Sequence, residues 1–364
     1  MEAWLKGSGA VGLDHLEVAD FPVTGRGVRA RRHFRAGDKI LTIPAANLWT
    51  VKNAHADPII GSVLASAQLS DEDTLALYLL FVRSRDQGYE GQKSHVAAMP
   101  SSYTSSIFFT DEELQVSEGT SLNVLTDQLL ERVENDYRRL LADFVLSQYP
   151  DVFSLEKFTL EDYKWALCAV WSRAMDFKIA QDNSVRLIAP FADMLNHSSE
   201  VKQCHAYDPN SGNLTVFAGK DYEAGDQVFI NYGPVANNRL LRLYGFVLPD
   251  NPHDSYDLVL QTSPMAPLYE EKQRFWKMGG LDATSKIPLT RDDPLPTSLL
   301  RYLRIQRMEE GDFPTMTLQL VNKADAKLSD ANETQILQFL LESIAWRAAT
   351  APTSRGATPG RPRR

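Results

Sequence analysis

Two short polar segments, each set among apolar residues, carry the side chains best suited to chemistry. Residues 193–198 read DMLNHS and residues 231–233 read NYG, both within the stretch 186–247. Their carboxylate, amide, imidazole and phenol groups can form hydrogen bonds with a ligand. A strand-turn-strand pattern separates the two segments, so they are distant in sequence but can meet in space. We therefore expect the reaction site here.

Two other interpretations of these residues are weaker. Asn196, His197 and Ser198 also match an N-glycosylation sequon. The N-terminus carries acidic residues early and lacks a basic region followed by an apolar core, so we expect no signal peptide. His197 and His205 could ligate a metal, but no Cys, His or carboxylate set has suitable spacing. The sequence therefore predicts no metal.

The composition narrows the class of protein. The chain has 364 residues, 43% of them hydrophobic, and a formal net charge of −9. That charge argues against nucleic-acid binding, which needs clustered Lys and Arg. No apolar run approaches the roughly 20 residues that span a bilayer, so we expect no membrane contact. Cys168 and Cys204 are too few for a disulfide framework, which favours the cytoplasm, and the Arg-rich end could add a nuclear address.

Residues 12–61 predict short strands joined by turns, with alternating residues at 39–43. Between the strands lie Gly25, Arg26 and Gly27. The two glycines can adopt positive φ or let a ligand approach the backbone without a Cβ in the way. A simple hairpin turn is the alternative interpretation.

Residues 62–176 predict a helical insertion between two strand-rich regions. Three acidic residues from Asp71 precede an apolar helix, as the helix dipole favours. Thr110 with Glu113 makes a capping box, and Thr159 caps a further helix. Apolar residues between 122 and 144 recur at helical spacing.

Strand signals return in residues 177–250. A turn at 209–212 precedes a strand at 214–218, which we expect to pair with residues 203–207. The AGD turn at 224–226 repeats the one at 36–38, and each feeds an alternating strand. This pattern predicts several small sheets rather than a doubly wound α/β domain.

The remaining chain predicts helices broken by prolines. Within residues 251–350 we expect a basic helix at 298–308 and a final helix near 334–348. Residues 351–364 are rich in Pro, Gly and Arg, which predicts a disordered tail.

Together these segments resemble the SET-domain protein methyltransferases. The resemblance is to the branch that includes Rubisco large-subunit methyltransferase and the actin-histidine methyltransferase. It implies an α+β fold: a SET-type β fold of several small sheets in two parts, 12–61 and 177–250, with a helical insertion and a short, helical, substrate-binding C-terminal domain at 251–350. Its most specific feature is NHS, followed about 35 residues later by NYG and then YGF. Six segments carry it: residues 25–28, 163–175, 189–198, 224–233, 237–247 and 299–303.

The resemblance also implies the activity. In this family S-adenosylmethionine donates a methyl group to a protein side chain by in-line displacement, for which orientation and desolvation are the enzyme's main work. Tyr232 is similar to the catalytic tyrosine, and Arg173 to the residue that binds the cofactor carboxylate through planar paired donors. The cofactor-binding residues implied are Gly25, Arg26, Gly27, Arg173, Asp193, Asn196, His197, Tyr232, Tyr244 and Phe246. Plain core packing is the alternative for Tyr244 and Phe246, and turn capping the alternative for Asp193.

Met175, Ala192 and Tyr244 are the expected channel residues for the acceptor side chain. The histidine-methylating branch has an Asn two residues after the Arg and a Trp before the Asp, where this chain has Met175 and Ala192. A histidine acceptor needs a polar partner to fix its tautomer, and Met175 cannot supply a strong one. We therefore predict a protein-lysine N-methyltransferase that acts, as a monomer, on a non-histone protein. Histidine methylation and a non-catalytic SET-like protein-binding module are the alternatives.

The chain departs from the family pattern at residues 94–98. Family members usually carry a Trp and a Tyr before the Leu-Pro that corresponds to Met99 and Pro100, whereas this chain reads SHVAA. A cofactor contact from that segment is therefore in question.

Overall fold

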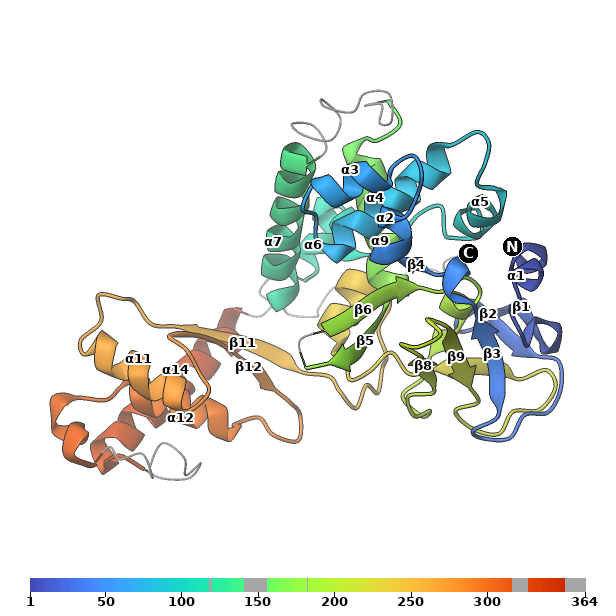
Figure 1. Ribbon diagram of the computed structural model, residues 1–364. Helices are drawn as coiled ribbons and strands as arrows, with labels where there is room; N and C mark the ends of the chain where they lie inside the picture. Colours follow the sequence, from blue (N-terminus) through green and yellow to red (C-terminus); the bar gives the residue numbers. More distant parts are fainter. Residues whose placement is uncertain (118–119, 141–155, 182, 316–326, 351–364) are drawn as a thin grey trace. The chain divides into compact units, whose positions relative to one another are not determined.

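The structure divides the chain into two units, each described here by itself (Figure 1). The first contains residues 1–108, 126–235 and 239–252, and the second contains residues 109–125, 236–238 and the chain from 253 onward. The computed structural model describes residues 1–117, 120–140, 156–181, 183–315 and 327–350. The expected tail at 351–364 and the end of the expected 122–144 helix lie outside the described residues.

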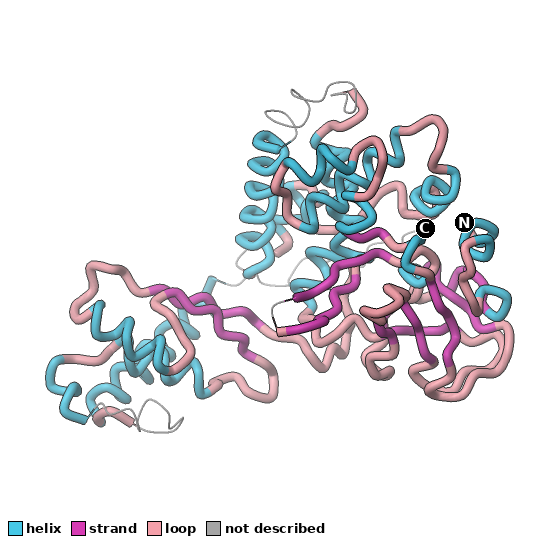
Figure 2. The backbone as a smooth tube through the Cα atoms, viewed as in Figure 1, coloured by secondary structure: helices cyan, strands magenta, loops and turns pink. Residues whose placement is uncertain are grey.

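The described residues of the first unit form three small sheets (Figure 2). This arrangement confirms the expected fold class. One sheet has the order β1 (Leu16–Phe21), β2 (Gly25–Ala30), β10 (Gln227–Ile230), β7 (Asn196–His197). The second has the order β3 (Lys39–Ile43), β9 (Leu214–Phe217), β8 (His205–Tyr207), and the third β4 (Trp49–Thr50), β6 (Asn183–Ile188), β5 (Met175–Ala180).

The repeated AGD turns are present, and each leads into a strand. Gly37 and Gly225 have φ of +88° and +102°, a left-handed conformation that side chains with a Cβ disfavour. These glycines allow β3 and β10 to start directly after a tight turn. The expected pairing of residues 214–218 with 203–207 is also confirmed, as the antiparallel β8–β9 hairpin.

Strand β10 brings the two polar segments together. It pairs antiparallel with β2 and parallel with β7, where Phe229 lies opposite Asn196 and Ile230 opposite His197. The Ser198 N–H continues the ladder by donating to the Ile230 carbonyl at 3.0 Å. The residues that follow β10 therefore emerge beside the NH pair.

Helices fill the insertion, as expected, although its limits differ from 62–176. Helical structure already begins at Val51, and strand β5 starts at Met175 directly after the last helix. The capping boxes at Thr110 and Thr159 are both present. The helices of this region are α2 (Val51–His55), α3 (Gly61–Ser66), α4 (Asp71–Ser84), α5 (Glu90–Val96), α6 (Asp111–Gln115), α7 (Ser121–Asp136) and α9 (Leu160–Arg173), with the short η3 (Ser106–Phe108).

Short helices also occur in other parts of the described chain. They are α1 (Glu2–Gly7), η1 (Leu13–His15), η2 (Ala45–Asn47), η5 (Ala192–Met194), α10 (Asn237–Arg239), η6 (Leu240–Tyr244) and η7 (Glu310–Thr315).

Helices α4 and α9 form the centre of the helical core. Every residue of α4 from Asp73 to Val82 is buried, and eight residues of α9 are buried. Each fully buried Leu, Val or Phe side chain contributes about 1.5–3 kcal/mol of transfer free energy. This packing fixes the C-terminal end of α9, where Arg173 lies.

The second unit contains a two-stranded sheet that the sequence did not suggest. Strand β11 (Tyr256–Gln261) pairs antiparallel with β12 (Thr284–Leu289) beside helices α11 (Tyr269–Met278), α12 (Thr297–Gln306) and α14 (Asp330–Thr350). Both predicted helices, at 298–308 and near 334–348, are confirmed as α12 and α14. Trp276 stacks on Tyr302 with ring centroids 4.9 Å apart in the core of this unit. No described helix is long and apolar enough to cross a membrane.

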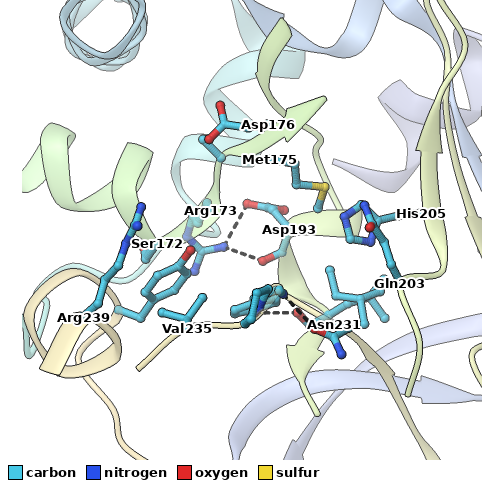
Figure 3. A pocket seen from close by; sticks show the side chains of 17 residues that line it. Ser172, Arg173, Met175, Asp176, Asp193, Gln203, His205, Asn231, Val235 and Arg239 are labelled. Carbon is cyan, nitrogen blue, oxygen red and sulfur yellow. Dashed lines mark hydrogen bonds and ion pairs between the residues drawn. The ribbon is translucent and has the colours of Figure 1, made fainter. Parts of the chain in front are cut away.

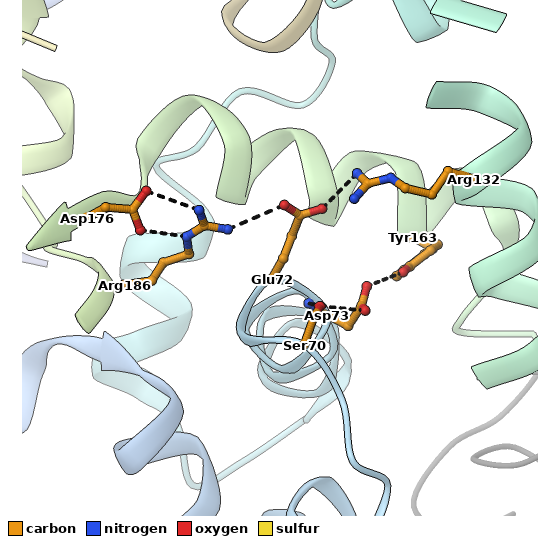
Figure 4. A network of polar contacts seen from close by, with 7 residues as sticks. All are labelled: Ser70, Glu72, Asp73, Arg132, Tyr163, Asp176 and Arg186. Carbon is orange, nitrogen blue, oxygen red and sulfur yellow. Dashed lines mark hydrogen bonds and ion pairs between the residues drawn. The ribbon is translucent and has the colours of Figure 1, made fainter. Parts of the chain in front are cut away.

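An ionic network joins the first turn of α4 to the β5–β6 hairpin (Figure 4). Arg186 on β6 contacts both carboxylate oxygens of Asp176, at 2.8 and 3.0 Å, and Glu72 at 3.4 Å. Glu72 also accepts a hydrogen bond from Arg132 at 2.9 Å. The network holds β5, which begins at the reaction site, against the helical core.

We expect Tyr163→Phe to destabilise the protein. Asp73 is buried and accepts hydrogen bonds from the Tyr163 hydroxyl and the Ser70 cap (Figure 4). Removing the phenol leaves a buried carboxylate oxygen unpaired, which costs about 1–3 kcal/mol. Urea denaturation of the full chain measures the loss. The control Tyr256→Phe, at an exposed ring, should change the free energy of unfolding by less than about 0.5 kcal/mol. Equal effects of the two variants would contradict this account.

Candidate active site

A cavity of about 310 Å³ lies in the first unit, at the C-terminal end of α9 (Figure 3). It has polar side chains on several walls. Its lining comes from residues 172–176, from Asp193 and Leu195, from Gln203 and His205, from residues 230–235, and from Arg239 and Tyr244. Five segments of the chain therefore meet at one pocket.

Arg173 enters the pocket because α9 ends there. The next residue, Ala174, is extended, so the helix stops and β5 begins. The Arg173 guanidinium donates from Nη1 to the Asp193 carboxylate at 2.9 Å and to the Asp193 backbone carbonyl at 3.2 Å. Burial alone would lower the pKa of Arg173, but the Asp193 carboxylate keeps it above its ordinary value. The pair is ionised and buried.

The segment that carries Asp193 is strained. Phe191, which is fully buried, has φ +70°, a conformation that costs a non-glycine residue about 1–3 kcal/mol. The turn η5 follows it, and the Asp193 N–H donates to the Ala189 carbonyl at 2.9 Å. Strain of this kind persists where surrounding packing enforces it, and here it turns Asp193 toward Arg173.

A buried histidine completes this pair. His95 Nε2 lies 2.9 Å from the same Asp193 oxygen, and the Trp49 indole donates to His95 Nδ1 at 2.9 Å. Burial alone would raise the pKa of Asp193, but His95 and Arg173 together hold it below its ordinary range. The sequence marked the segment 94–98 only as a departure from the family pattern. The histidine of this segment, His95, contacts the site residue Asp193 without lining the cavity itself.

Tyr232 lies just after β10, and both its backbone N–H and its side-chain hydroxyl form hydrogen bonds. Its N–H donates to His197 Nδ1 at 3.0 Å, and its hydroxyl donates to the Leu195 carbonyl at 2.8 Å. Its ring stacks on Tyr244 with centroids 5.4 Å apart, and Tyr244 meets the edge of Phe246 at 6.2 Å. Burial raises the pKa of Tyr232. The phenol is therefore a fixed, protonated hydroxyl.

The glycine turn lies next to Asn196. The Asn196 amide donates to the Arg26 carbonyl at 3.1 Å and to the Thr24 carbonyl at 3.4 Å. Gly25 has φ +66°, as a glycine turn allows. A Cβ on Gly27 would lie 2.8 Å from the Asn196 amide nitrogen and 2.5 Å from the Gln227 amide, so glycine is needed there for close approach.

The structure brings most of the expected residues together. Arg173, Met175, Asp193, Tyr232 and Tyr244 line the cavity. Ala192 does not: as the first residue of η5 it is fully buried and packs in the core behind the pocket. The other expected residues are not part of the lining: His197 and Phe246 contact the lining residues Tyr232 and Tyr244, whereas Gly25, Arg26, Gly27 and Asn196 form a separate group of contacts.

Polar residues that the sequence analysis did not assign also line the cavity. His205 meets the edge of Phe177 at 5.6 Å, and burial lowers its pKa, so its ring is neutral. Its Nδ1 is buried without a hydrogen-bond partner in the described chain. Gln203 and Arg239 flank the same cavity (Figure 3). The available signals were the position of Gln203 and His205 two residues apart in the expected strand at 203–207, and the position of Arg239 after the NYG segment.

The described residues include no group of three or more His, Cys, Asp and Glu that could hold a metal ion. Two polar atoms of cavity-lining residues, Asp193 Oδ1 and Arg173 Nε, are buried without a hydrogen-bond partner in the part of the chain that is described. One is an acceptor and the other a donor. The Arg173 side chain is 11% exposed and is a charged donor of the lining, so the site suits a ligand that presents a carboxylate.

Comparison with known families decides the relationship. The profile of the SET domain matches residues 25–233, more than half of the chain. This protein belongs to the SET-domain family. A second profile, Rubisco LSMT substrate-binding, matches residues 263–355. The expected resemblance is confirmed.

Individual relatives of this SET-domain protein come from both branches. Actin-histidine N-methyltransferase of Danio rerio is 26% identical and matches 90% of this chain. The chloroplastic ribulose-1,5-bisphosphate carboxylase/oxygenase large subunit N-methyltransferase of Pisum sativum is 29% identical and matches 83% of this chain. The chain spans only 56% and 62% of the lengths of these two curated relatives.

Solved structures show the same fold. The SET domain of LSMT bound to lysine and AdoHcy has a TM-score of 0.82 at 24% identity, covering 97% of this chain and 81% of that chain. The same domain bound to methyllysine and AdoHcy has a TM-score of 0.82 at 25% identity, with the same coverage.

We expect Tyr232 to titrate later than an ordinary tyrosine. Desolvation of the phenolate raises its pKa above the ordinary value of about 10. An alkaline absorbance titration of the wild-type protein minus that of Tyr232→Phe isolates this one phenol. The difference in phenolate absorbance should stay flat at pH values up to about 10.5. An ordinary tyrosine, by contrast, is already more than half ionised at that pH. A difference signal with a midpoint near the ordinary value would show that the hydroxyl is solvated.

Proposed function

We propose that this SET-domain protein is a protein-lysine N-methyltransferase that uses S-adenosylmethionine and acts on a non-histone protein. The observation that carries the proposal is a protonated tyrosine hydroxyl fixed by the Leu195 carbonyl, in a pocket that also holds the Arg173–Asp193 pair. The methyltransferase names of the relatives and the AdoMet- and AdoHcy-bound solved structures support the same activity.

The residues present fit the amino-acid end of this cofactor. Its carboxylate would accept hydrogen bonds from Arg173, whose partly exposed guanidinium belongs to the cavity lining. The glycine turn at Gly25 and Gly27, held by the Asn196 amide, would hold another part of the cofactor through its backbone. When bound, the cofactor supplies a methyl group on a cationic sulfur.

Tyr232 then orients the acceptor. Its O–H already donates to Leu195, so the oxygen lone pairs remain to accept an N–H of a neutral amine. This hydrogen bond turns the amine lone pair toward the methyl group without any proton transfer to the phenol. The half-buried, stacked rings of Tyr232 and Tyr244 limit the access of water, so orientation and partial desolvation are the contributions of this chain.

Lysine is the favoured acceptor because of the wall formed by Met175. Met175 is one of the lining residues of the cavity, and its thioether offers only a weak hydrogen-bond acceptor. A flexible, apolar wall suits the methylene stem of lysine, whereas an imidazole needs a polar partner to fix its tautomer.

Histidine methylation is the second candidate, and one observation favours it. Gln203 and His205 line the same cavity and carry polar atoms that could hydrogen-bond an imidazole. Several relatives named actin-histidine N-methyltransferase match 90–93% of this chain. The identity of the acceptor therefore depends on which wall of the cavity it contacts.

We expect Tyr232→Phe to abolish most methyl transfer while preserving cofactor binding. The change removes the hydroxyl that orients the acceptor but keeps the ring that stacks on Tyr244. A misoriented nucleophile lowers the rate by about 100-fold or more. Labelled S-adenosylmethionine, incubated with the protein and a cell lysate, measures transfer, and mass spectrometry identifies the modified residue. Calorimetry with S-adenosylhomocysteine measures binding.

The outcomes of that experiment separate the alternatives. Cofactor binding without transfer to any protein would support a non-catalytic SET-like module. Transfer that is unchanged in Tyr232→Phe would remove the tyrosine from the mechanism. A methylated histidine in place of a methylated lysine would replace the favoured acceptor with the second candidate.

The pH dependence of transfer offers an independent distinction. A lysine amine, with an ordinary pKa of about 10.4, becomes nucleophilic only as it loses its proton, so kcat/KM should rise tenfold per pH unit from about pH 7 to 9. A histidine acceptor, with a pKa of about 6.5, would give a plateau above about pH 7.5. Because burial raises the pKa of Tyr232, its ionisation adds no limb in this range. Steady-state rates on a peptide containing the identified site measure the profile.

A further inference from the structure

Four side chains from four parts of the chain form a continuous hydrogen-bonded row behind the pocket. The Trp49 indole donates to His95 Nδ1 at 2.9 Å, and His95 Nε2 lies 2.9 Å from Asp193 Oδ2. The same oxygen accepts from Arg173 Nη1 at 2.9 Å. His95 and the Asp193 side chain are fully buried, and the Arg173 side chain is 11% exposed.

The row has a defined direction. An indole N–H can only donate, so His95 Nδ1 must be the accepting nitrogen of its ring. A neutral imidazole with a lone pair on Nδ1 carries its proton on Nε2. Nε2 therefore donates to Asp193, and the contact of the Trp49 and His95 rings, with centroids 5.9 Å apart, keeps the imidazole in this orientation.

The direction of these hydrogen bonds determines which donors each carboxylate oxygen of Asp193 receives. Oδ2 takes two donors, one from His95 and one from Arg173, while Oδ1 has no partner in the described chain. A carboxylate held by two donors on one oxygen cannot rotate freely. The Arg173 guanidinium that pairs with this carboxylate is thereby held at the cavity lining.

We propose that His95 is a positioning residue, which acts through Asp193 to hold the Arg173 guanidinium ready for the carboxylate of S-adenosylmethionine. The inference rests on the proposed function, because it takes the pocket to be the cofactor site. His95 itself is outside the cavity lining, so it acts on a bound ligand only through Asp193. It supplies to Asp193 a hydrogen bond that an apolar side chain cannot replace.

A purely structural role for His95 makes a different prediction. His95 is buried in the first unit, so any loss of packing there lowers stability. If that were its whole contribution, cofactor affinity would follow stability and not the chemistry of residue 95. A suitable test therefore varies the hydrogen bond and the stability separately.

The experiment compares His95→Gln, His95→Leu and Val133→Ala. Glutamine keeps an N–H donor that can reach Asp193, whereas leucine fills similar space without one. Val133 is fully buried in the helical core and is not a member of the row, so its truncation lowers stability without removing any hydrogen bond of the row. Calorimetry with S-adenosylhomocysteine gives the dissociation constant of each variant, and thermal unfolding gives its stability.

We expect His95→Leu to weaken binding by about tenfold or more, the usual effect of removing a group that orients a ligand-binding residue. His95→Gln should stay within about threefold of the wild type, and Val133→Ala should bind as the wild type does despite its lower melting temperature. Affinity that falls equally in His95→Leu and Val133→Ala, or equally in both His95 variants, would overturn the inference.

A readout without cofactor separates this inference from the proposed function. Crystal structures of the free wild-type protein and of the His95 variants show the orientation of Arg173 directly. We expect Nη1 to leave Asp193 Oδ2 in His95→Leu and to remain in His95→Gln; an unmoved guanidinium in His95→Leu refutes the positioning role. A wild-type protein that binds no S-adenosylhomocysteine would instead refute the proposed function. Should His95→Leu not fold, Trp49→Phe, which keeps a ring but removes the indole donor, takes its place and should weaken binding less than tenfold but more than His95→Gln.

Discussion

The buried carboxylate of Asp193 is the constraint on which the site depends. An isolated ionised carboxylate in the protein interior would cost several kcal/mol, so it must be matched by donors and an opposite charge. Arg173 supplies the charge from the end of α9, and His95 supplies a second donor from α5. The helical insertion therefore takes part in the site, since both partners of Asp193 come from it.

The second constraint is the pairing of β10 with strands on both sides. Parallel pairing with β7 places Tyr232 beside His197 and brings its hydroxyl to the Leu195 carbonyl. Antiparallel pairing with β2 brings the glycine turn to the same end of the sheet. Three segments separated by up to two hundred residues thus reach one site through main-chain hydrogen bonds, and β-sheet register fixes the relative position of their side chains.

The sequence predicted the parts of this site that depend on local patterns. The NHS and NYG segments, the capped helices and the AGD turns all have signatures within a few residues, and the structure contains each of them. His95 was not assigned a role, because its function comes from contacts with Trp49 and Asp193, which are 46 and 98 residues away. Ala192 was placed in the channel from its position next to Asp193, but the strained backbone at Phe191 turns it into the core. Strand β11 was missed because only one of its residues is fully buried, and β12, whose burial does alternate, was missed because it contains Pro288, which argues against a strand.

Some of the unfavourable features of the described chain lie at the cavity. The strained Phe191 lies within a few residues of Asp193, and the unpaired atoms Asp193 Oδ1, Arg173 Nε and His205 Nδ1 belong to residues that line the cavity. Each lowers the stability of the free protein, because buried polar groups without partners and left-handed backbone both cost free energy. A ligand that pairs any of these atoms recovers part of that cost when it binds. Binding must therefore stabilise the first unit by mass action, and affinity for the cofactor and stability of the fold are linked through the same few atoms.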